Sequence, residues 1–143
     1  MKLMLFVVAL IPPALLRWLV RWRFNSVQQQ APISVARSLK SERVLLLDVR
    51  TRDEFNSGHL ATAIHINDAE SALQIIRDFR LNTPHGQVVA YCTVGYRSAQ
   101  FAERMASVGG VHVKNLEGGI WAWAAAGLPV AGVTASSGRK AAP

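Results

Sequence analysis

Uninterrupted apolar runs alternate along this chain with stretches whose apolar residues recur at helical spacing. Residues 44–47 and 88–91 are continuous apolar runs, typical of strands buried on both faces of a parallel sheet. Residues 64–66 and 111–113 are weaker strand candidates. The spacing between these runs predicts helices over residues 34–40, 52–57, 69–81, 98–107 and 119–126. Such alternation predicts an α/β fold with a mostly parallel sheet.

The beginning of the chain is its most hydrophobic stretch. Residues 3–16 carry no charge and no hydrogen-bonding side chain, and Trp18 and Trp22 are aromatic residues of the kind expected at a membrane interface. Pro12 and Pro13 remove two backbone donors, so a helix would bend or break there. The pattern predicts a membrane-associated N-terminal helix, which either spans the membrane or lies on its surface. A buried core helix is the alternative.

Basic residues outnumber acidic ones, with 16 Lys and Arg against 9 Asp and Glu and a formal net charge of +7. Four of the basic residues lie in residues 1–24, which hold no acid, and two more lie near the C-terminus. Residues 25–130 hold the other ten basic residues and all nine acids. This nearly neutral body excludes a basic groove for nucleic acid. Arginines that follow the apolar segment predict that the attached domain is cytoplasmic.

These patterns divide the chain into four parts. Residues 1–24 form the predicted membrane anchor, 25–32 a polar linker, 33–130 one folded domain and 131–143 a flexible tail. Cys92 is the only cysteine, so no intramolecular disulfide can form. No Cys and His residues have the spacing of a zinc site, so no metal is predicted.

Both continuous apolar runs end in a side chain that can do chemistry. Asp48 follows the first run and Cys92 the second, and ligands of open parallel sheets gather beyond the carboxyl ends of the strands. Residues 92–98 lead into a helix with Ser98 as its expected N-cap, and Gly95 permits a tight loop with inward N–H groups. A helix N-terminus favours a thiolate and suits a bound anion. The alternative is a small core cysteine at a strand end.

Three segments, in order along the chain, carry a resemblance to one family. They are Asp48-Val49-Arg50 with Glu54-Phe55, Gly58-His59-Leu60, Ala63 and Ile66-Asn67; then Cys92-Thr93-Val94-Gly95-Tyr96-Arg97-Ser98; then Leu116-Glu117-Gly118-Gly119-Ile120-Trp121 with Trp123, Gly127 and Pro129. On these residues the segment 33–130 resembles a single-domain rhodanese, of the thiosulfate sulfurtransferase family.

The resemblance implies a parallel sheet of about five strands flanked by helices. It also implies that Cys92 accepts a sulfane sulfur from thiosulfate or a persulfide, holds it as a persulfide and passes it to a thiol or cyanide. Asp48 and Arg50 are interpreted as structural support of the site. No cofactor is implied. The expected substrate-binding residues are those that follow the cysteine, namely Thr93, Val94, Gly95, Tyr96, Arg97 and Ser98.

One departure from the family pattern bears on the sulfur donor. Many members that use thiosulfate have a second arginine where this chain has Thr93, so a dianion should bind less well here. Two other functions are weighed against sulfur transfer. A cysteine phosphatase or arsenate reductase has five residues between its cysteine and arginine, whereas four separate Cys92 from Arg97. A membrane-tethered interaction module would keep the fold without turnover.

Overall fold

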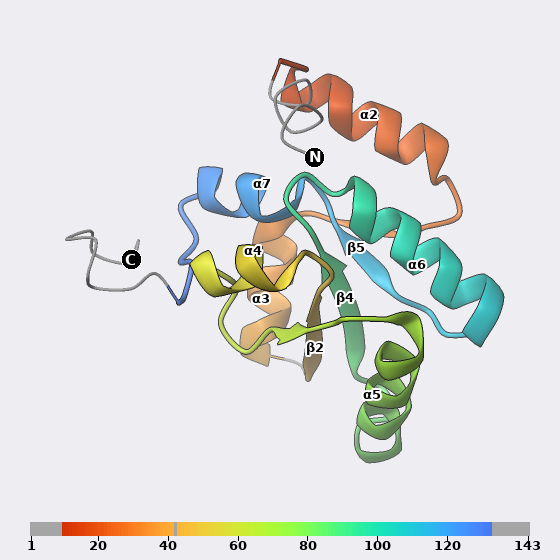
Figure 1. The fold of residues 1–143 in the computed structure, drawn as a ribbon. Helices are drawn as coiled ribbons and strands as arrows, with labels where there is room; N and C mark the ends of the chain where they lie inside the picture. The colour runs from red at the N-terminus through yellow and green to blue at the C-terminus, as the bar shows by residue number, and fades with distance from the viewer. Residues whose placement is uncertain (1–9, 42, 133–143) are drawn as a thin grey trace.

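The computed structural model describes residues 10–41 and 43–132. Within them the chain forms a five-stranded, wholly parallel sheet with the strand order β1-β5-β4-β2-β3 (Figure 1). This confirms the predicted α/β fold and its sheet. The strands are β1 (Gln29–Gln30), β2 (Val44–Asp48), β3 (Ile64–His65), β4 (Gln87–Tyr91) and β5 (Lys114–Leu116).

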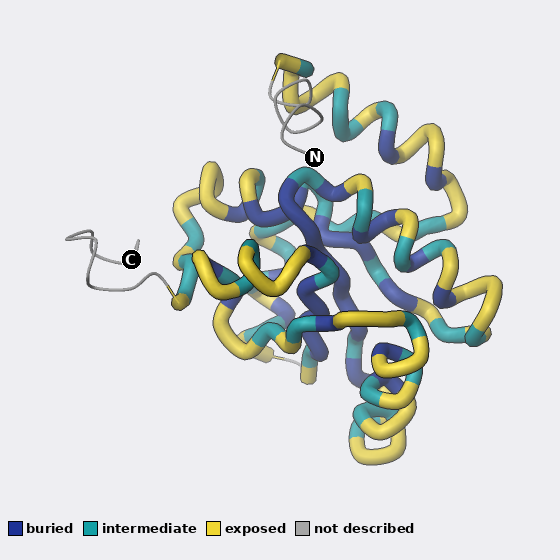
Figure 2. The backbone as a smooth tube through the Cα atoms, viewed as in Figure 1, coloured by how far each residue is buried: buried dark blue, intermediate teal, exposed yellow. Residues whose placement is uncertain are grey.

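Helices cover both faces of the sheet and give it two separate cores. One core packs β2 and β4 against α5 (Ala69–Asn82) and α6 (Tyr96–Gly109). The other packs the opposite faces of these strands against α3 (Pro32–Ser41) and α7 (Gly119–Ala125). Figure 2 shows the central strands as the buried part of the fold. The uninterrupted apolar runs are explained by this burial on both sides.

The carboxyl ends of the two central strands lie side by side. Asp48, the last residue of β2, is in register with Tyr91, the last residue of β4, and with His65 of β3. Because the strands are parallel, the residues that follow them meet at one edge of the sheet. The short helix α4 (Arg52–Ser57) follows β2 at this edge, and the segment beginning at Cys92 follows β4.

Two strands differ from the prediction. The expected strand over residues 111–113 is wrong: the Val111 N–H bonds to the Met105 carbonyl and closes α6, and pairing begins only at Lys114. In the segment expected as a linker, β1 pairs with β5 at the sheet edge. Both strands are short and largely polar, so no run of apolar residues marks them.

The helix α2 (Pro13–Arg23) is the described part of the predicted membrane anchor. Pro12 precedes it as N-cap, so the helix begins where the proline pair was expected to interrupt one. Its Val20 and the following Phe24 are buried against Ala99 of α6. No helix among residues 10–41 and 43–132 is long and apolar enough to cross a membrane, and residues 1–9 of the predicted anchor lie outside the described residues.

The end of the described chain is tied to the domain. His59 and Ala131 form an isolated antiparallel bridge, with N···O distances of 2.9 and 2.7 Å. Ala131, the first residue of the expected tail, therefore belongs to the fold. Residues 133–143 of that tail lie outside the described residues.

Candidate active site

The cysteine loop, residues 92–98, encloses the thiol of Cys92. The Cys92 side chain has no exposed surface. The backbone N–H of Gly95 donates to Cys92 Sγ at 3.1 Å, and the hydroxyl of Ser98 lies 3.3 Å from the same sulfur. Gly95 has a φ of 95°, in the left-handed region that favours glycine, and this conformation turns its N–H toward the sulfur.

The loop leads directly into α6. Gly95 is the N-cap of that helix, which begins at Tyr96, so the expectation that Ser98 caps it is wrong. Ser98 lies instead in the first turn and is fully buried. Its hydroxyl lies between Cys92 Sγ and Asn115 Oδ1, 2.5 Å from the latter. The positive end of the α6 dipole is therefore directed at the thiol, where it favours negative charge on the sulfur.

The N-terminus of α7 holds the outer side of the cysteine loop. The N–H of Ile120 donates to the Cys92 carbonyl at 2.9 Å, and the N–H of Trp121 donates to the Thr93 carbonyl at 3.1 Å. Gly119 has a φ of 64°, and a Cβ at this position would lie 2.5 Å from the Cys92 carbonyl oxygen. Only glycine lets the two segments approach this closely. The Gly118-Gly119 pair thus fixes the position of the loop.

Asn115 of β5 is a site-supporting residue that the sequence reasoning missed. It is fully buried. Its amide nitrogen donates to the Gly95 carbonyl at 3.0 Å and to Gln29 Oε1 at 2.9 Å, while its oxygen accepts from Ser98. These contacts connect β5 to the cysteine loop, to the first turn of α6 and to β1. The available signal was an asparagine next to the glycine-rich third segment, where a buried polar residue needs several partners.

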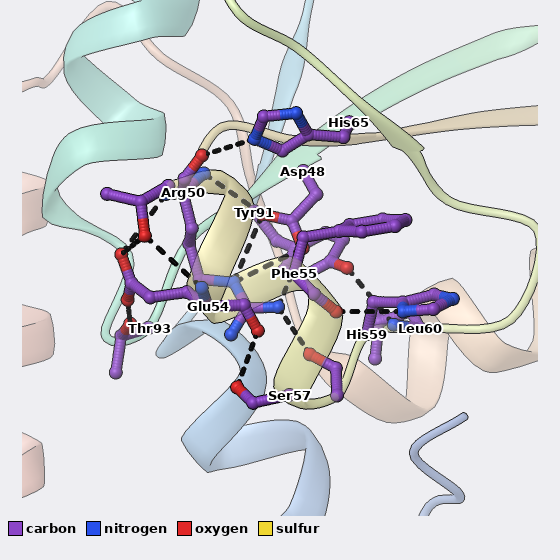
Figure 3. Close-up of polar contacts among 12 residues, drawn as sticks. Asp48, Arg50, Glu54, Phe55, Ser57, His59, Leu60, His65, Tyr91 and Thr93 are labelled. Carbon is purple, nitrogen blue, oxygen red and sulfur yellow. Dashed lines mark hydrogen bonds and ion pairs between the residues drawn. The ribbon is translucent and has the colours of Figure 1, made fainter. Parts of the chain in front are cut away.

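Arg97 and Thr93 of the loop bond to the carboxylate of Glu54 from α4. Arg97 makes a bidentate pair with Glu54, with N···O distances of 3.0 and 3.1 Å. Thr93 Oγ1 donates to Glu54 at 3.1 Å and accepts from Arg97 at 3.0 Å. Figure 3 shows Glu54 and Thr93 joined in this network. Glu54, Thr93 and Arg97 therefore form one cluster beside the thiol, in which the negative charge of Glu54 balances the positive charge of Arg97.

The cluster shifts the titration of both charged members. The hydrogen bond from Arg97 lowers the pKa of Glu54 from its ordinary 4.5 to about 2. The hydrogen bond to Glu54 raises the pKa of Arg97, and burial opposes this rise.

Glu54, like Asn115, contacts the cysteine loop but was given no role in the sequence analysis. Its signal was the capping box of α4, in which Thr51 and Glu54 bond reciprocally.

Asp48 and Arg50, which precede α4 in the chain, form a second pair that is buried. Arg50 donates to both carboxylate oxygens of Asp48, at 3.0 and 2.7 Å, and to the Gly58 carbonyl at 2.6 Å (Figure 3). Burial, together with a hydrogen bond to Asp48, raises the pKa of Tyr91, whose hydroxyl also accepts from the Leu60 N–H at 3.0 Å. These contacts tie β2, β4 and the segment after α4 together.

Val94 and Tyr96 lie at the outside of the cysteine loop. Tyr96 is partly exposed and meets the buried Phe24 ring edge-on, with ring centroids 5.1 Å apart. Val94 and Trp121 line an apolar hollow of about 380 Å³ between α2 and α7. A second hollow of similar volume is lined by Arg97, Gln100, Phe101 and Arg104 among others. Cys92 lines neither hollow.

Comparison with known proteins defines the class of this domain. Residues 32–126 match the family model of the rhodanese-like domain. The chain belongs to the rhodanese-like domain family, as the three sequence segments indicated. A single domain of this family accounts for the described fold.

Relatives in this family include proteins named as sulfurtransferases. The chain is 32% identical over 113 residues to thiosulfate sulfurtransferase 16 of Arabidopsis thaliana, covering 73% of this chain and 94% of that protein. It is 36% identical over 91 residues to a sulfurtransferase of Allochromatium vinosum, covering 63% and 80%. It is also 38% identical over 95 residues to the HTH-type transcriptional regulator Rv0324 of Mycobacterium tuberculosis, of which it spans only 40%.

Solved structures show the same fold. The chain superimposes on the thiosulfate sulfurtransferase from Pseudomonas aeruginosa with a TM-score of 0.69 at 22% identity. The match covers 85% of this chain and 23% of that one. At this identity the likeness establishes the fold alone.

Proposed function

We propose that this protein is a sulfurtransferase that carries a sulfane sulfur as a persulfide on Cys92. The observation that carries the proposal is the enclosure of the thiol: Gly95 donates its N–H to the sulfur at 3.1 Å while the α6 N-terminus faces it. An anionic sulfur is stabilised by such donors, whether it is the thiolate or the outer atom of a persulfide. The family relationship to named sulfurtransferases supports the same chemistry.

The proposed reaction has two steps, each of which transfers one sulfur atom. The Cys92 thiolate attacks the outer sulfur of the donor, forms a new S–S bond and expels the donor's remaining thiolate with the electron pair of the broken S–S bond. With thiosulfate the expelled group is sulfite. A thiol or cyanide acceptor then attacks the outer sulfur on Cys92, and the electron pair of that S–S bond returns to Cys92. One cysteine is sufficient for this cycle.

The Glu54–Arg97–Thr93 cluster favours a donor of low charge. Arg97 is the only guanidinium of the cysteine loop, and Glu54 compensates it at 3.0 and 3.1 Å. Thr93 contributes a hydroxyl and no charge. A thiosulfate dianion therefore meets a nearly neutral cluster, whereas a persulfide needs no free cation. We infer that a persulfide is the better donor and that thiosulfate works weakly.

The same cluster argues against the phosphatase alternative. A phosphoryl group carries two charges in a tetrahedral set of oxygens, and the loop arginine that would bind it is engaged by Glu54. The four-residue spacing from Cys92 to Arg97 leaves a small enclosure around the sulfur. Aryl phosphate turnover is accordingly expected to be absent.

We also propose that residues 1–24 associate with a membrane and leave the domain on the cytoplasmic side. Supporting this are the uncharged residues 3–16 and the arginines that follow them. Protease digestion of the domain in opened cells but not in intact cells is the expected result. Recovery of the full chain in the soluble fraction would contradict membrane association.

Mass spectrometry of the intact protein tests the sulfur-transfer proposal. After incubation with a persulfide donor, wild type should gain the mass of one sulfur atom and lose it on addition of a thiol. Cys92→Ser and Cys92→Ala fit the same buried site and should gain nothing and lose all turnover. Turnover that persists in both variants, or robust aryl phosphate hydrolysis by wild type, would overturn the mechanism. A wild type that stays unmodified would favour the non-catalytic interaction module.

A further inference from the structure

Helix α2 has two apolar faces, and only one of them is covered by the domain. Val20 and the adjoining Phe24 are 4% and 0% exposed against α6. On the opposite side Leu15, Trp18 and Trp22 are 48%, 58% and 67% exposed. A helix that is apolar on two sides normally has a partner for each. The outer face of α2, defined by Leu15, Trp18 and Trp22, lacks one within the described residues.

The three outer side chains form one continuous stripe. Their spacing of three and four residues places them on the same side of a helix. Trp18 and Trp22 are stacked, with ring centroids 6.4 Å apart and an interplanar angle of 9°. Figure 2 shows α2 at the periphery of the molecule with much of its length exposed. Large exposed apolar residues that adjoin in this way mark a binding surface.

Arginines flank the stripe. Arg17, Arg21 and Arg23 have side chains that are 40%, 60% and 52% exposed. Arg17 and Arg21 share the single carboxylate of Glu117, and Arg23 lies 3.8 Å from Glu103. Three guanidinium groups thus face two carboxylates, which leaves net positive charge beside the tryptophans.

This combination fits the surface of an anionic bilayer better than a protein partner. Tryptophan residues prefer the headgroup region, arginines bind anionic headgroups, and an amphipathic helix binds with its axis in the membrane plane. The chain that leads into α2 continues the apolar character, because residues 3–11 include no charged or polar side chain. The helix itself has 11 residues, too few to span the hydrocarbon core.

We propose that α2 lies flat on an anionic membrane, with its outer face in the interface and its inner face fixed to the domain. This inference rests on the membrane association proposed above and identifies the surface responsible for it. The inner face is also in contact with the cysteine loop, because Phe24 packs edge-on against Tyr96 of that loop. The inference is independent of which sulfur donor is used.

Binding of the full-length protein to vesicles tests the proposal. Wild type should bind vesicles of phosphatidylcholine with phosphatidylglycerol more tightly than phosphatidylcholine alone. W18S/W22S should reduce binding to the anionic vesicles about tenfold. The matched control is L81S/V108S, which removes two apolar residues that are 80% and 68% exposed on α5 and α6. It should bind as wild type does.

A second measurement, the quenching of tryptophan fluorescence by brominated lipids, tests the proposal even if W18S/W22S does not fold. W18F/W22F keeps the apolar face and should bind as wild type does, but it should lose most of the quenching by lipids brominated near the headgroups. Wild-type binding by a folded W18S/W22S, or unchanged quenching in W18F/W22F, would overturn the role of the outer face while leaving membrane association in place. No vesicle binding by wild type would overturn both proposals.

Discussion

Two carboxylate–guanidinium pairs, Asp48–Arg50 just before α4 and Glu54–Arg97 from α4 to the cysteine loop, differ in burial and in what surrounds them. Asp48 and Arg50 have side chains that are 0% and 7% exposed and bond to backbone and side chains of the sheet edge. Glu54 and Arg97 are 26% and 34% exposed and join α4 to the cysteine loop. The first pair sits in low dielectric with its bonds fully used, and the second sits at a surface beside the thiol.

This difference shows that a carboxylate–guanidinium pair can affect mainly protein stability at one position and mainly the charge beside Cys92 at another. Breaking a buried pair leaves an uncompensated charge away from water, which is strongly destabilising. A half-exposed pair is screened, so its loss costs little stability. Its effect falls instead on the net charge that a donor meets at Cys92. We therefore expect stability to report on Asp48 and substrate preference to report on Glu54.

The largest expected effect comes from Asp48→Asn. The substitution keeps the shape of the side chain but leaves Arg50 charged and buried, so the free energy of unfolding should fall by about 3–5 kcal/mol. Urea unfolding measures it. A loss below about 1 kcal/mol would show that the two pairs do not differ in the way their burial indicates.

Thr93→Arg should give the next largest effect. A second guanidinium beside Glu54 leaves the cluster with one uncompensated cation, so the KM for thiosulfate should fall by about 5–30-fold, equivalent to about 1–2 kcal/mol. The KM for a neutral persulfide donor should change much less. Side-by-side kinetics with both donors provide the measurement, and an equal change for both would contradict a charge effect. Thermal unfolding checks that the buried position accepts the larger side chain.

Glu54→Gln sharpens the comparison with Asp48→Asn directly. It frees Arg97 from its partner, so the KM for thiosulfate should fall by a few-fold while the free energy of unfolding drops by less than about 1 kcal/mol. Glu103→Gln is the matched control, because Glu103 is also a surface carboxylate paired with an arginine but lies away from the cysteine loop. If both variants leave the thiosulfate KM unchanged, the compensation of Arg97 does not set donor preference.

The smallest expected effect is on the free energy of unfolding at acidic pH. The folded-state pKa of Glu54 is lowered to about 2 from 4.5, so its stabilising contribution is complete above pH 4.5 and is lost as the pH falls toward 2. Replacing Glu54 by Gln should flatten the pH dependence of unfolding in that window. Urea titrations of wild type and variant at several pH values test this. Superimposable slopes would place the acid sensitivity of the protein elsewhere.

The predictable parts of this fold are those with a local signal. The continuous apolar runs of β2 and β4 and the helical spacing of α4, α5 and α7 identified these elements with little error at their ends. β1 and β5 were not predictable in this way, since most of their residues are polar and the pairing that defines them joins segments far apart in the sequence.

The candidate site also contains residues with a local sequence signal and residues without one. Cys92, Gly95 and Arg97 lie within six consecutive residues, and their sequence context was enough to single them out. Glu54 meets Arg97 across 43 positions, and Asn115 meets Ser98 across 17, so neither contact leaves a local trace. The apolar character of α2 was visible, but composition could not show that half of it faces α6.

Because Cys92 has no exposed surface, the thiol is also sheltered from oxidants in solution. Peroxides convert exposed thiolates to sulfenic acid and then irreversibly to sulfinic and sulfonic acids. This chain has no second cysteine that could trap the first oxidation product as a disulfide. The sulfur transfer proposed for Cys92 requires that a donor reach this buried thiol, and any opening of the loop that admits a donor also exposes the thiol to irreversible oxidation.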